Sequence, residues 1–474
     1  MNTCNGKRTG ILLVALVAVF ALASLLWLHR VRGPQAASAR SVAVSSVAPA
    51  PASLVGPVAS ARSAAAVGWS EAADARTAVH EAIAMMRSRL GGKTPTYAIA
   101  TFTVLHDRET TIAALRSELG PQVQIHGATS AAGIMTNEGL HVGKVVGVLG
   151  VACDDVRFGV GDIDPDQCST LEDAGKQAIL QAIRNAGHQP DEKPDIILFT
   201  ASMRRGGEMK MLDGIAAVVG PDVPVLGGNA GDEKFDSSWT QFTQKGMYHE
   251  GLVLTAVYSQ RKLGWAFESG FRITDKSGVV TKSDGKTIYE IDHRPALDVY
   301  NEWLNGALMD YIHKSGHYDI AAFTAQYPLC KVLRGPSGQV GYMTSHPVPK
   351  EADMGPKTLP VYALIEEGSR IQLFSATWQT ILNRAELAPA NALIRGDIPR
   401  NDGLFGMLFF CSGAYYSIPA SERPKLPLLV GNAIGDTPYL GVFTVGEQGY
   451  IPGVRNVSAN LVESMVTVGN QKKD

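Results

Sequence analysis

The alternation of apolar and polar residues divides the chain into short strands and amphipathic helices from about residue 67 onward. Helices are predicted where apolar residues recur every three to four positions, and strands where short apolar runs end in turn-forming residues. In the first half, the predicted helices span residues 71–90, 109–119, 171–186 and 208–219. The predicted strands there span residues 97–105, 123–125, 144–152, 155–160, 195–200, 223–226, 252–258 and 264–268. This alternation of strands and helices is typical of an α/β protein.

Two strand-to-loop segments in this half have nearly the same sequence. Residues 120–127 read GPQVQIHG and residues 220–227 read GPDVPVLG, and each run leads into a loop of small residues. Around both segments the predicted order is strand, helix, strand, loop and an antiparallel strand pair. We therefore predict a layered α/β domain of two duplicated units with mixed sheets. A chance match of two short sequences is the alternative, and the matched order of elements disfavours it.

The second half is less periodic and predicts a second α/β domain. Its predicted strands span residues 370–375, 404–411, 427–431 and 440–444, and its predicted helices span residues 295–304, 377–385 and 391–395. The first of these helices closes the first domain or crosses to the next. The predicted domain boundaries are therefore 67–310 and 311–468, followed by a tail at 469–474.

The N-terminal segment has the strongest compositional signal. After a tail at 1–10, residues 11–28 form an unbroken run of 18 apolar or small residues with basic side chains on both flanks. This length predicts an uncleaved transmembrane anchor, with cleavage near the small residues 37–39 as the alternative. Residues 29–66, rich in Ala, Ser and Pro, predict a disordered linker. The flanking charges barely decide the orientation, and the short tail favours an inner-membrane protein whose bulk is periplasmic rather than cytoplasmic.

Composition excludes some classes of function. The net charge of -2 is near neutral and no long basic run occurs, so nothing indicates nucleic-acid binding. The five cysteines include no C-x-x-C pair, which argues against a zinc site of standard spacing. Cys153 and Cys168 are close enough in sequence to pair in an oxidising compartment, although single thiols are the more common arrangement.

The two small-residue loops are the main candidate binding site. The candidate ligand-binding residues in them are Gly127, Thr129, Ser130, Gly227, Gly228 and Asn229. Their backbone amides and short side chains could bind a carboxylate or a similar anion. The alternative is a tight turn where two backbones pack closely, since neither loop completes a Walker or dinucleotide-binding motif.

Four further residues are candidates for chemistry. Asp232 could stabilise its own loop or bind the ammonium group of a ligand, and Glu447 could pair with a ligand amine or with Arg455. Cys411 ends an apolar strand and could face a cleft, although inert burial is the commoner role of such a thiol. As a nucleophile it would need a base, which no neighbouring motif supplies. His126, beside the first loop, is a candidate haem or metal ligand, with a packed histidine as the default.

Several short motifs, in their order and spacing, resemble the FIST family of bacterial sensory proteins, which have an N-terminal and a C-terminal half. The resemblance covers about residues 67–468. The motifs that carry it are GATSA at 127–131, GGNAGD at 227–232, IYEID at 288–292, PALDVY at 295–300, FCSG at 410–413 and FTVGE at 443–447.

The resemblance implies a ligand-sensing module that binds small molecules such as amino acids and is often attached to a signalling output. Some members of the family look like haem-binding nitric oxide sensors. This sequence departs from the family pattern at Ala128, where a cysteine is common, at Gly133, where an acidic residue is common, and at residues 414–416, where an arginine is expected.

We therefore expect a membrane-anchored sensory protein that binds an amino acid or similar metabolite in a cleft between repeat halves and signals to a downstream protein. A haem-binding gas sensor and an enzyme using Cys411 are the alternatives. The sequence favours a binding protein over an enzyme, because no nucleophile lies beside a base in a recognised spacing.

Overall fold

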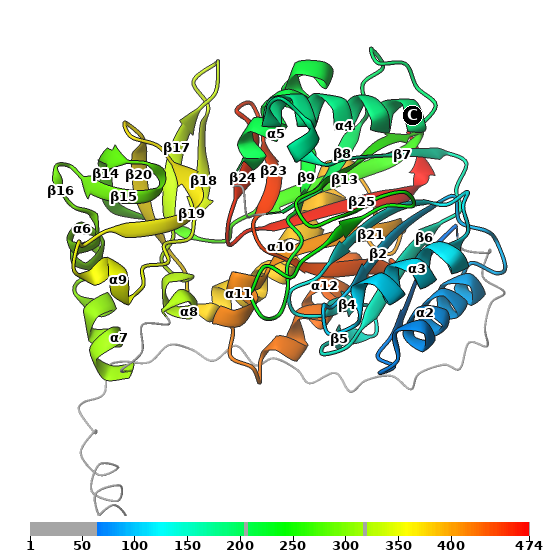
Figure 1. Ribbon diagram of the computed structural model, residues 1–474, viewed down its shortest axis with the longest axis horizontal. Coiled ribbons are helices and arrows are strands. Elements are labelled where there is room, and N and C mark those ends of the chain that lie inside the picture. The colour runs from blue at the N-terminus through cyan, green and yellow to red at the C-terminus, as the bar shows by residue number, and fades with distance from the viewer. Residues whose placement is uncertain (1–63, 203–206, 316–319, 474) are drawn as a thin grey trace, which may run out of the picture. The chain divides into compact units, whose positions relative to one another are not determined.

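The computed structural model describes residues 64–202, 207–315 and 320–473. The predicted anchor at 11–28 and nearly all of the predicted linker lie outside the described residues. No described helix is long and apolar enough to cross a membrane. The described part is an α/β protein, as predicted, with four sheets of six, six, six and seven strands (Figure 1).

Three of these sheets belong to three repeats of one plan, not to the two repeats that were predicted. The first repeat comprises β1 (Ala65–Ser70), α2 (Ala75–Arg89), β2 (Tyr97–Phe102), α3 (Arg108–Leu119), β3 (Gln124–Thr129), β4 (Ile134–Thr136), β5 (Gly139–His141) and β6 (Val146–Val151). The second comprises β7 (Val156–Ile163), α4 (Leu171–Asn185), β8 (Ile196–Ala201), α5 (Glu208–Val219), β9 (Val225–Gly228), β10 (Gln241–Phe242), β11 (Met247–Tyr248) and β12 (Leu252–Ser259). The third comprises β13 (Arg261–Glu268), α10 (Trp378–Gly396), β21 (Gly403–Cys411), α11 (Ser412–Ser417), α12 (Leu426–Ile434), β22 (Tyr439–Thr444), β23 (Glu447–Ile451), β24 (Arg455–Ala459) and β25 (Glu463–Lys472).

An insertion separates β13 from α10 and hides the third repeat in the sequence. It consists of β14 (Arg272–Ser283), β15 (Gly285–Ile291), β16 (Arg294–Pro295), α6 (Ala296–Trp303), α7 (Ala307–Ser315), α8 (Ala321–Thr324), β17 (Leu329–Arg334), β18 (Val340–Ser345), α9 (Glu351–Met354), β19 (Leu359–Ile365) and β20 (Arg370–Ser375). Its strands form the fourth sheet, whose pairings are all antiparallel. Residue 310, the predicted domain boundary, falls inside α7.

The register of the sheets shows which residues correspond among the repeats. Each repeat has one parallel strand pair, β2–β3, β8–β9 or β21–β22, at the centre of its sheet. The aligned residues in these pairs are Ala100 with Gly127, Phe199 with Gly227, and Leu408 with Gly441. The FTVGE segment at 443–447 therefore corresponds to the two small-residue loops found in the sequence.

Each repeat gives its hairpin to the sheet of another repeat. Strand β4 of the first repeat pairs with β22 of the third, β10 of the second pairs with β3 of the first, and β23 of the third pairs with β9 of the second. The exchange is cyclic, so every six-stranded sheet is completed by strands from a different repeat. A pseudo-threefold axis relates the three sheets.

Three backbone hydrogen bonds close the ring near this axis. They are Ala131 N to Phe443 O at 2.9 Å, Gly231 N to Thr129 O at 3.2 Å, and Val445 N to Asn229 O at 3.2 Å. Between the sheets, Tyr97, Phe158 and Phe405 bring one ring from each sheet into the shared core, with centroid separations of 4.1 Å for the first pair and 6.3 Å for the second. The helices cover the outer faces, as with α2 on β1 and α4 on β7 (Figure 1).

Several local predictions were wrong for identifiable reasons. Residues 427–431 belong to helix α12 rather than a strand, because Leu426, Val430 and Ile434 recur every four positions on its buried face. The strands predicted as antiparallel pairs lie in different sheets, since β6 pairs with β1 and β2 while β7 pairs with β12. Helix α10 runs unbroken through Pro389, and α2 begins after its cap at Asp74 rather than after Ser70.

We expect Gly227→Ala to destabilise the protein by about 1–3 kcal/mol, because a Cβ there would lie 1.9 Å from the carbonyl oxygen of Phe199. Gly431→Ala is the control, since nothing lies within 4 Å of a Cβ at that position in α12 and alanine favours helix. Urea unfolding of both variants measures the difference. Equal unfolding midpoints would contradict the close approach of β9 to β8.

Candidate functional site

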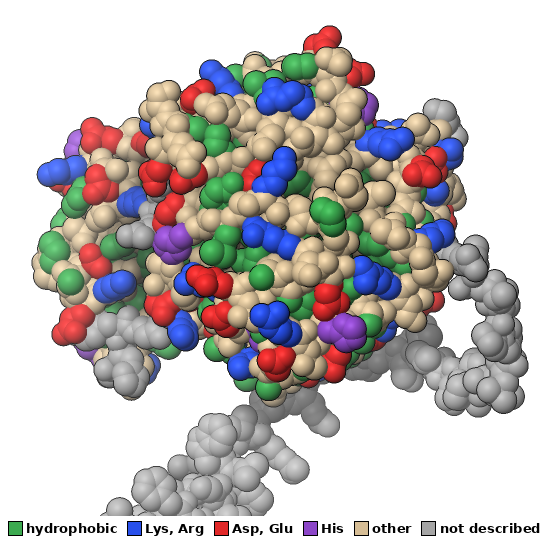
Figure 2. Space-filling view, turned by 45° about the vertical axis from the view of Figure 1, so that its right-hand side comes forward, with side chains coloured by type: hydrophobic (Ala, Val, Ile, Leu, Met, Phe, Trp, Pro, Cys, Tyr) green, Lys and Arg blue, Asp and Glu red, His purple; other side chains and the backbone are tan. Residues whose placement is uncertain are grey.

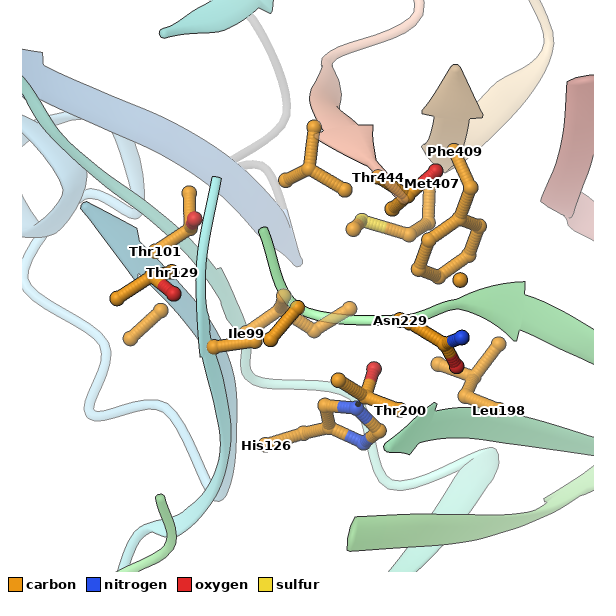
Figure 3. Close-up of a pocket in the computed structure, with 15 residues that line it drawn as sticks. Ile99, Thr101, His126, Thr129, Leu198, Thr200, Asn229, Met407, Phe409 and Thr444 are labelled. Carbon is orange, nitrogen blue, oxygen red and sulfur yellow. Dashed lines mark hydrogen bonds between the residues drawn. The ribbon is translucent and has the colours of Figure 1, made fainter. Parts of the chain in front are cut away.

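The predicted loops converge on the axis around a very small cavity (Figure 3). Its volume is about 20 Å³, which admits about one water molecule. The lining includes Thr101, His126, Thr129, Thr200, Asn229, Met407, Phe409 and Thr444. The hydroxyl of Thr101 is buried there without a hydrogen-bond partner among the described residues, so a single water would complete its bonding.

The glycines of the loops allow close packing at the axis. A Cβ at Gly127 would lie 2.3 Å from the Phe242 ring, and one at Gly228 would lie 2.4 Å from Thr444. The hydroxyl of Ser130 accepts a hydrogen bond from Phe443 N at 2.8 Å, which ties the first loop to β22. These contacts correspond to the packing alternative of the sequence analysis. The role of Gly127, Thr129, Ser130, Gly227 and Gly228 in ligand binding stays a prediction.

His126 is buried between two threonine hydroxyls. Its Nδ1 lies 2.8 Å from Thr255 Oγ1 and its Nε2 lies 2.9 Å from Thr200 Oγ1. Burial lowers the pKa of His126 to about 3, so the ring is neutral at physiological pH. Both ring nitrogens are thus used within the core. Among the described residues, no group of three or more His, Cys, Asp or Glu side chains could hold a metal ion.

Asp232 and Asn229 support the second loop. Asp232 Oδ1 accepts from the backbone N–H of Lys234 at 3.0 Å and of Asp236 at 3.1 Å, an arrangement typical of Asx turns. Asn229 Nδ2 donates to Glu208 Oε1 at 3.0 Å. Burial raises the pKa of Glu208 to about 7. Nothing in the sequence singled out Glu208, which is an acidic residue at the start of a predicted helix.

A much larger cavity lies where the insertion meets the third repeat. Its volume is about 750 Å³. The insertion contributes Ile320, Ala321, Ala322, His346, Val348, Pro349, Lys350, Glu351 and Tyr362, and the repeats contribute Phe235, Cys411, Ser412, Gly413, Tyr416, Val445, Gly446 and Asn460. Of the predicted site residues, Cys411 alone is in this lining, while Glu447 directly follows Val445 and Gly446.

A polar annex adjoins this cavity and shares Tyr362, Gly446 and Asn460 with it. Glu208, Asn229 and Ser458 are also in its lining. A Cβ at Gly446 would lie 3.2 Å from Asn229 Nδ2 and 3.3 Å from Asn460 Nδ2, so the two amides converge at this glycine. The annex combines a buried carboxyl with these amides, but its volume of about 10 Å³ admits no more than about one water molecule.

His346 is a lining residue that the sequence analysis missed. Its Nε2 lies 3.0 Å from the carbonyl oxygen of Ala321, which can only accept, so Nε2 carries the proton. Burial lowers the pKa of His346 to about 4. The ring is therefore neutral, and Nδ1 is its acceptor.

Cys411 and Glu447 belong to a buried cluster with Arg384 and Glu463. Glu447 accepts hydrogen bonds from Thr444 Oγ1 at 2.8 Å and Val462 N at 3.3 Å. Arg384 Nε lies 3.6 Å from Glu463 Oε2, and both side chains are fully buried. Arg455, the partner suggested for Glu447, instead forms an ion pair with Asp213.

Burial dominates the protonation of this cluster. It raises the pKa of both Glu447 and Glu463 to about 8, although Arg384 opposes the shift in each case. It also raises the pKa of the Cys411 thiol to about 12, with a further contribution from the charge of Glu447. Cys153, Cys168, Cys330 and Cys411 are all free thiols.

Basic and acidic side chains are interspersed over the face of the molecule seen in Figure 2. The exposed ion pairs Arg294–Glu302 and Lys357–Asp298 illustrate this mixing on the insertion. Charge on this face is therefore distributed without a dominant sign.

The fold and motifs define a protein of the FIST family, and two family models match the chain. The FIST N domain matches residues 96–294 and the FIST C domain matches residues 296–450. The chain belongs to this family, as its motifs predicted. The two models meet at β16, inside the insertion, so the third repeat is divided between them.

Two similar proteins share limited sequence with this chain. An uncharacterized protein of Methanocaldococcus jannaschii, MJ1623, is 30% identical over 101 residues, which are 21% of this chain and 20% of that protein. The crystal structure of a cyanuric acid hydrolase from A. caulinodans aligns with 86% of this chain and 99% of its own, at 10% identity and a TM-score of 0.31. A score this low supports no functional argument.

In Glu447→Gln, the free energy of unfolding should fall less between about pH 5 and pH 8 than it does in the unaltered protein. The pKa of Glu447 is raised in the folded protein, so its contribution to stability is fully present below the unfolded pKa and is lost as the pH rises toward about 8. Urea midpoints at both pH values measure this. Glu422→Gln, which changes a carboxyl in a surface pair with Lys425, is the control. An unchanged pH dependence in Glu447→Gln would contradict the burial of a titrating carboxyl there.

Proposed function

We propose that the protein is a sensor that binds a small metabolite, such as an amino acid, in the cavity between the insertion and the third repeat. The observation that carries the proposal is the size of this cavity, about 750 Å³, within the range of ligand sites in proteins. The axial cavity of about 20 Å³ has no room for a metabolite. The proposed site therefore lies beside the predicted loops, at the outer end of the third one.

The lining supports a ligand with an apolar body and a polar head. Phe235, Ile320, Val348 and Tyr416 offer apolar and aromatic surface for the body. In the lining of the large cavity itself, the Glu351 carboxylate can accept hydrogen bonds from an ammonium group, and the Asn460 amide can donate to a carboxylate. An amino acid with an apolar side chain matches this combination.

The position of the cavity supports a signalling mechanism. The insertion joins the third repeat at only two chain crossings, between β13 and β14 and between β20 and α10. Across the interface, Asn460 N donates to Thr344 O at 2.9 Å, and Thr344 Oγ1 donates to Asn460 O at 2.6 Å. A ligand that contacts both sides would stabilise one arrangement of the insertion over others and so shift its population.

We further propose that residues 11–28 anchor the sensor in the inner membrane, with the folded part in the periplasm, and that a separate protein receives the signal. The support is the sequence alone: an apolar run long enough to span a bilayer, followed by a spacer. A topology reporter fused to the C-terminus, active only in the periplasm or only in the cytoplasm, decides the orientation.

Ala322→Trp should abolish the stabilisation by a bound ligand, because the indole would occupy the cavity that Ala322 lines. The probes are the twenty amino acids at millimolar concentration, and the readout is the rise in melting temperature, which a ligand of the native state produces. Ala216→Trp is the matched control, since Ala216 lines a separate surface hollow with Asp213 and Arg334. Loss of the shift in both variants, or in neither, would contradict the proposed cavity.

A further inference from the structure

The third repeat differs from the other two at three corresponding positions near the large cavity. The hairpin registers make Ile134, Gln241 and Glu447 equivalent. The registers of the last strands make Val146, Leu252 and Glu463 equivalent. The registers of the parallel strands make Thr103, Ser202 and Cys411 equivalent. Two carboxyls and a thiol thus replace neutral side chains in one repeat.

The fold does not require these substitutions. Burying a carboxyl is costly unless it is paired and hydrogen-bonded, and the first two repeats build the same sheet with neutral residues there. The cost is only partly offset in the third repeat. Arg384 Nε and Nη2 and both oxygens of Glu463 have no hydrogen-bond partner among the described residues, and both residues are almost fully buried. Buried ion pairs whose polar atoms are incompletely hydrogen-bonded are often found at functional sites.

The geometry joins the thiol to a base and to the cavity. Cys411 lines the cavity at the end of β21, whereas the buried Cys153 and Cys330 line none of the described hollows. Its Sγ accepts a hydrogen bond from Leu461 N at 3.3 Å, and the next N–H along the chain, that of Val462, donates to Glu447 Oε2 at 3.3 Å, so the sulfur and the carboxyl bind neighbouring amides. The base that the sequence analysis could not find for Cys411 therefore comes from the next hairpin.

We propose that Cys411 and Glu447 form a nucleophile and base pair that accepts an acyl group from a small ester or thioester bound in the cavity. The Cys411 sulfur attacks the carbonyl carbon while its proton passes to the Glu447 carboxylate. The new S–C bond forms, the bond from carbon to the leaving oxygen or sulfur breaks, and Glu447 returns the proton to the leaving group. This is an activity beyond the binding of a metabolite, and it needs no other group from the protein.

Protonation explains why both residues are required. Since its pKa is raised to about 12, the Cys411 thiol carries its proton at neutral pH and is a poor nucleophile alone. Glu447, with a pKa raised to about 8, becomes an effective base as the pH approaches that value. The groups that face Glu447 are Thr444 on β22, the Val462 N–H, Cys411, and Arg384 on α10, with Glu463 beyond the guanidinium. Arg384 stabilises the carboxylate that the reaction needs.

The test is the reaction of the full-length protein with p-nitrophenyl acetate. We expect a burst of about one equivalent of p-nitrophenolate and an acetyl group on the Cys411 peptide by mass spectrometry. The burst rate should rise with pH around a midpoint near 8, the pKa of Glu447. Cys411→Ala should abolish the burst, and Glu447→Gln should slow it at least about tenfold. Ala322→Trp should also slow it by blocking the cavity.

Cys330→Ser is the matched control, because Cys330 is a fully buried thiol in the insertion, and it should leave the burst unchanged. A burst that persists in Cys411→Ala, or that is equally fast in folded Glu447→Gln, overturns the proposal. If Glu447→Gln is unfolded under the assay conditions, the pH dependence of the burst rate in the unaltered protein is the test. A burst rate that does not rise near pH 8 overturns the proposal. The burst assay uses no amino acid, so the absence of a burst would not contradict the proposal that the cavity binds a metabolite. Likewise, the absence of a rise in melting temperature with amino acids would not contradict the proposed acyl transfer to Cys411.

Discussion

The cyclic exchange of hairpins is the constraint on which the rest of the structure depends. An edge strand exposes unpaired N–H and C=O groups, and here β3, β9 and β22 each have that edge covered by a hairpin from a different repeat. No repeat can complete its sheet alone, so the three fold as one body. The ring closes through backbone bonds such as Ala131 N to Phe443 O at 2.9 Å. Such close approach requires small residues beside the axis, which is the physical reason for glycine at 127, 227 and 441.

The same constraint leaves too little space for a metabolite at the axis. Three loops packed against one another leave about 20 Å³ between them, whereas the insertion, which is not part of the ring, meets the third repeat around about 750 Å³. The third repeat is also where charge is buried. Glu447 and Glu463 occupy positions whose counterparts in the other repeats are neutral, and Arg384 lies beside them, so the fold tolerates there a cluster that it does not need for stability. The three repeats form the scaffold, and the proposed site lies where the third repeat differs from the other two.

Much of the local structure could be predicted from sequence, because periodicity and caps are local signals. Strand β8 and helix α5 occur almost where their patterns predict them. The third repeat could not be recognised from the sequence, because the insertion at residues 272–375 separates its first strand from its first helix. In addition, residues 427–431 were predicted as a strand but belong to helix α12. Glu208 and His346 carried no sequence signal, because a lone acid in a helix or a lone histidine becomes informative only when its burial and neighbours are known. The base beside Cys411 lies 36 positions further along the chain, as the numbering of Glu447 shows, beyond any motif.

The sequence by itself determined the α/β class, the membership of the FIST family, the equivalence of the segments at 120–127 and 220–227, and Cys411 and Glu447 as residues of interest. Their relationship was decided only by the tertiary structure. Strand pairing between repeats, the closing of the ring and the docking of the insertion depend on contacts between residues far apart in the chain, and periodicity reports only which face of an element is apolar. Hydrophobic pattern therefore predicted the strands, while backbone hydrogen bonding across the axis decided their partners and, with them, where a cavity could form.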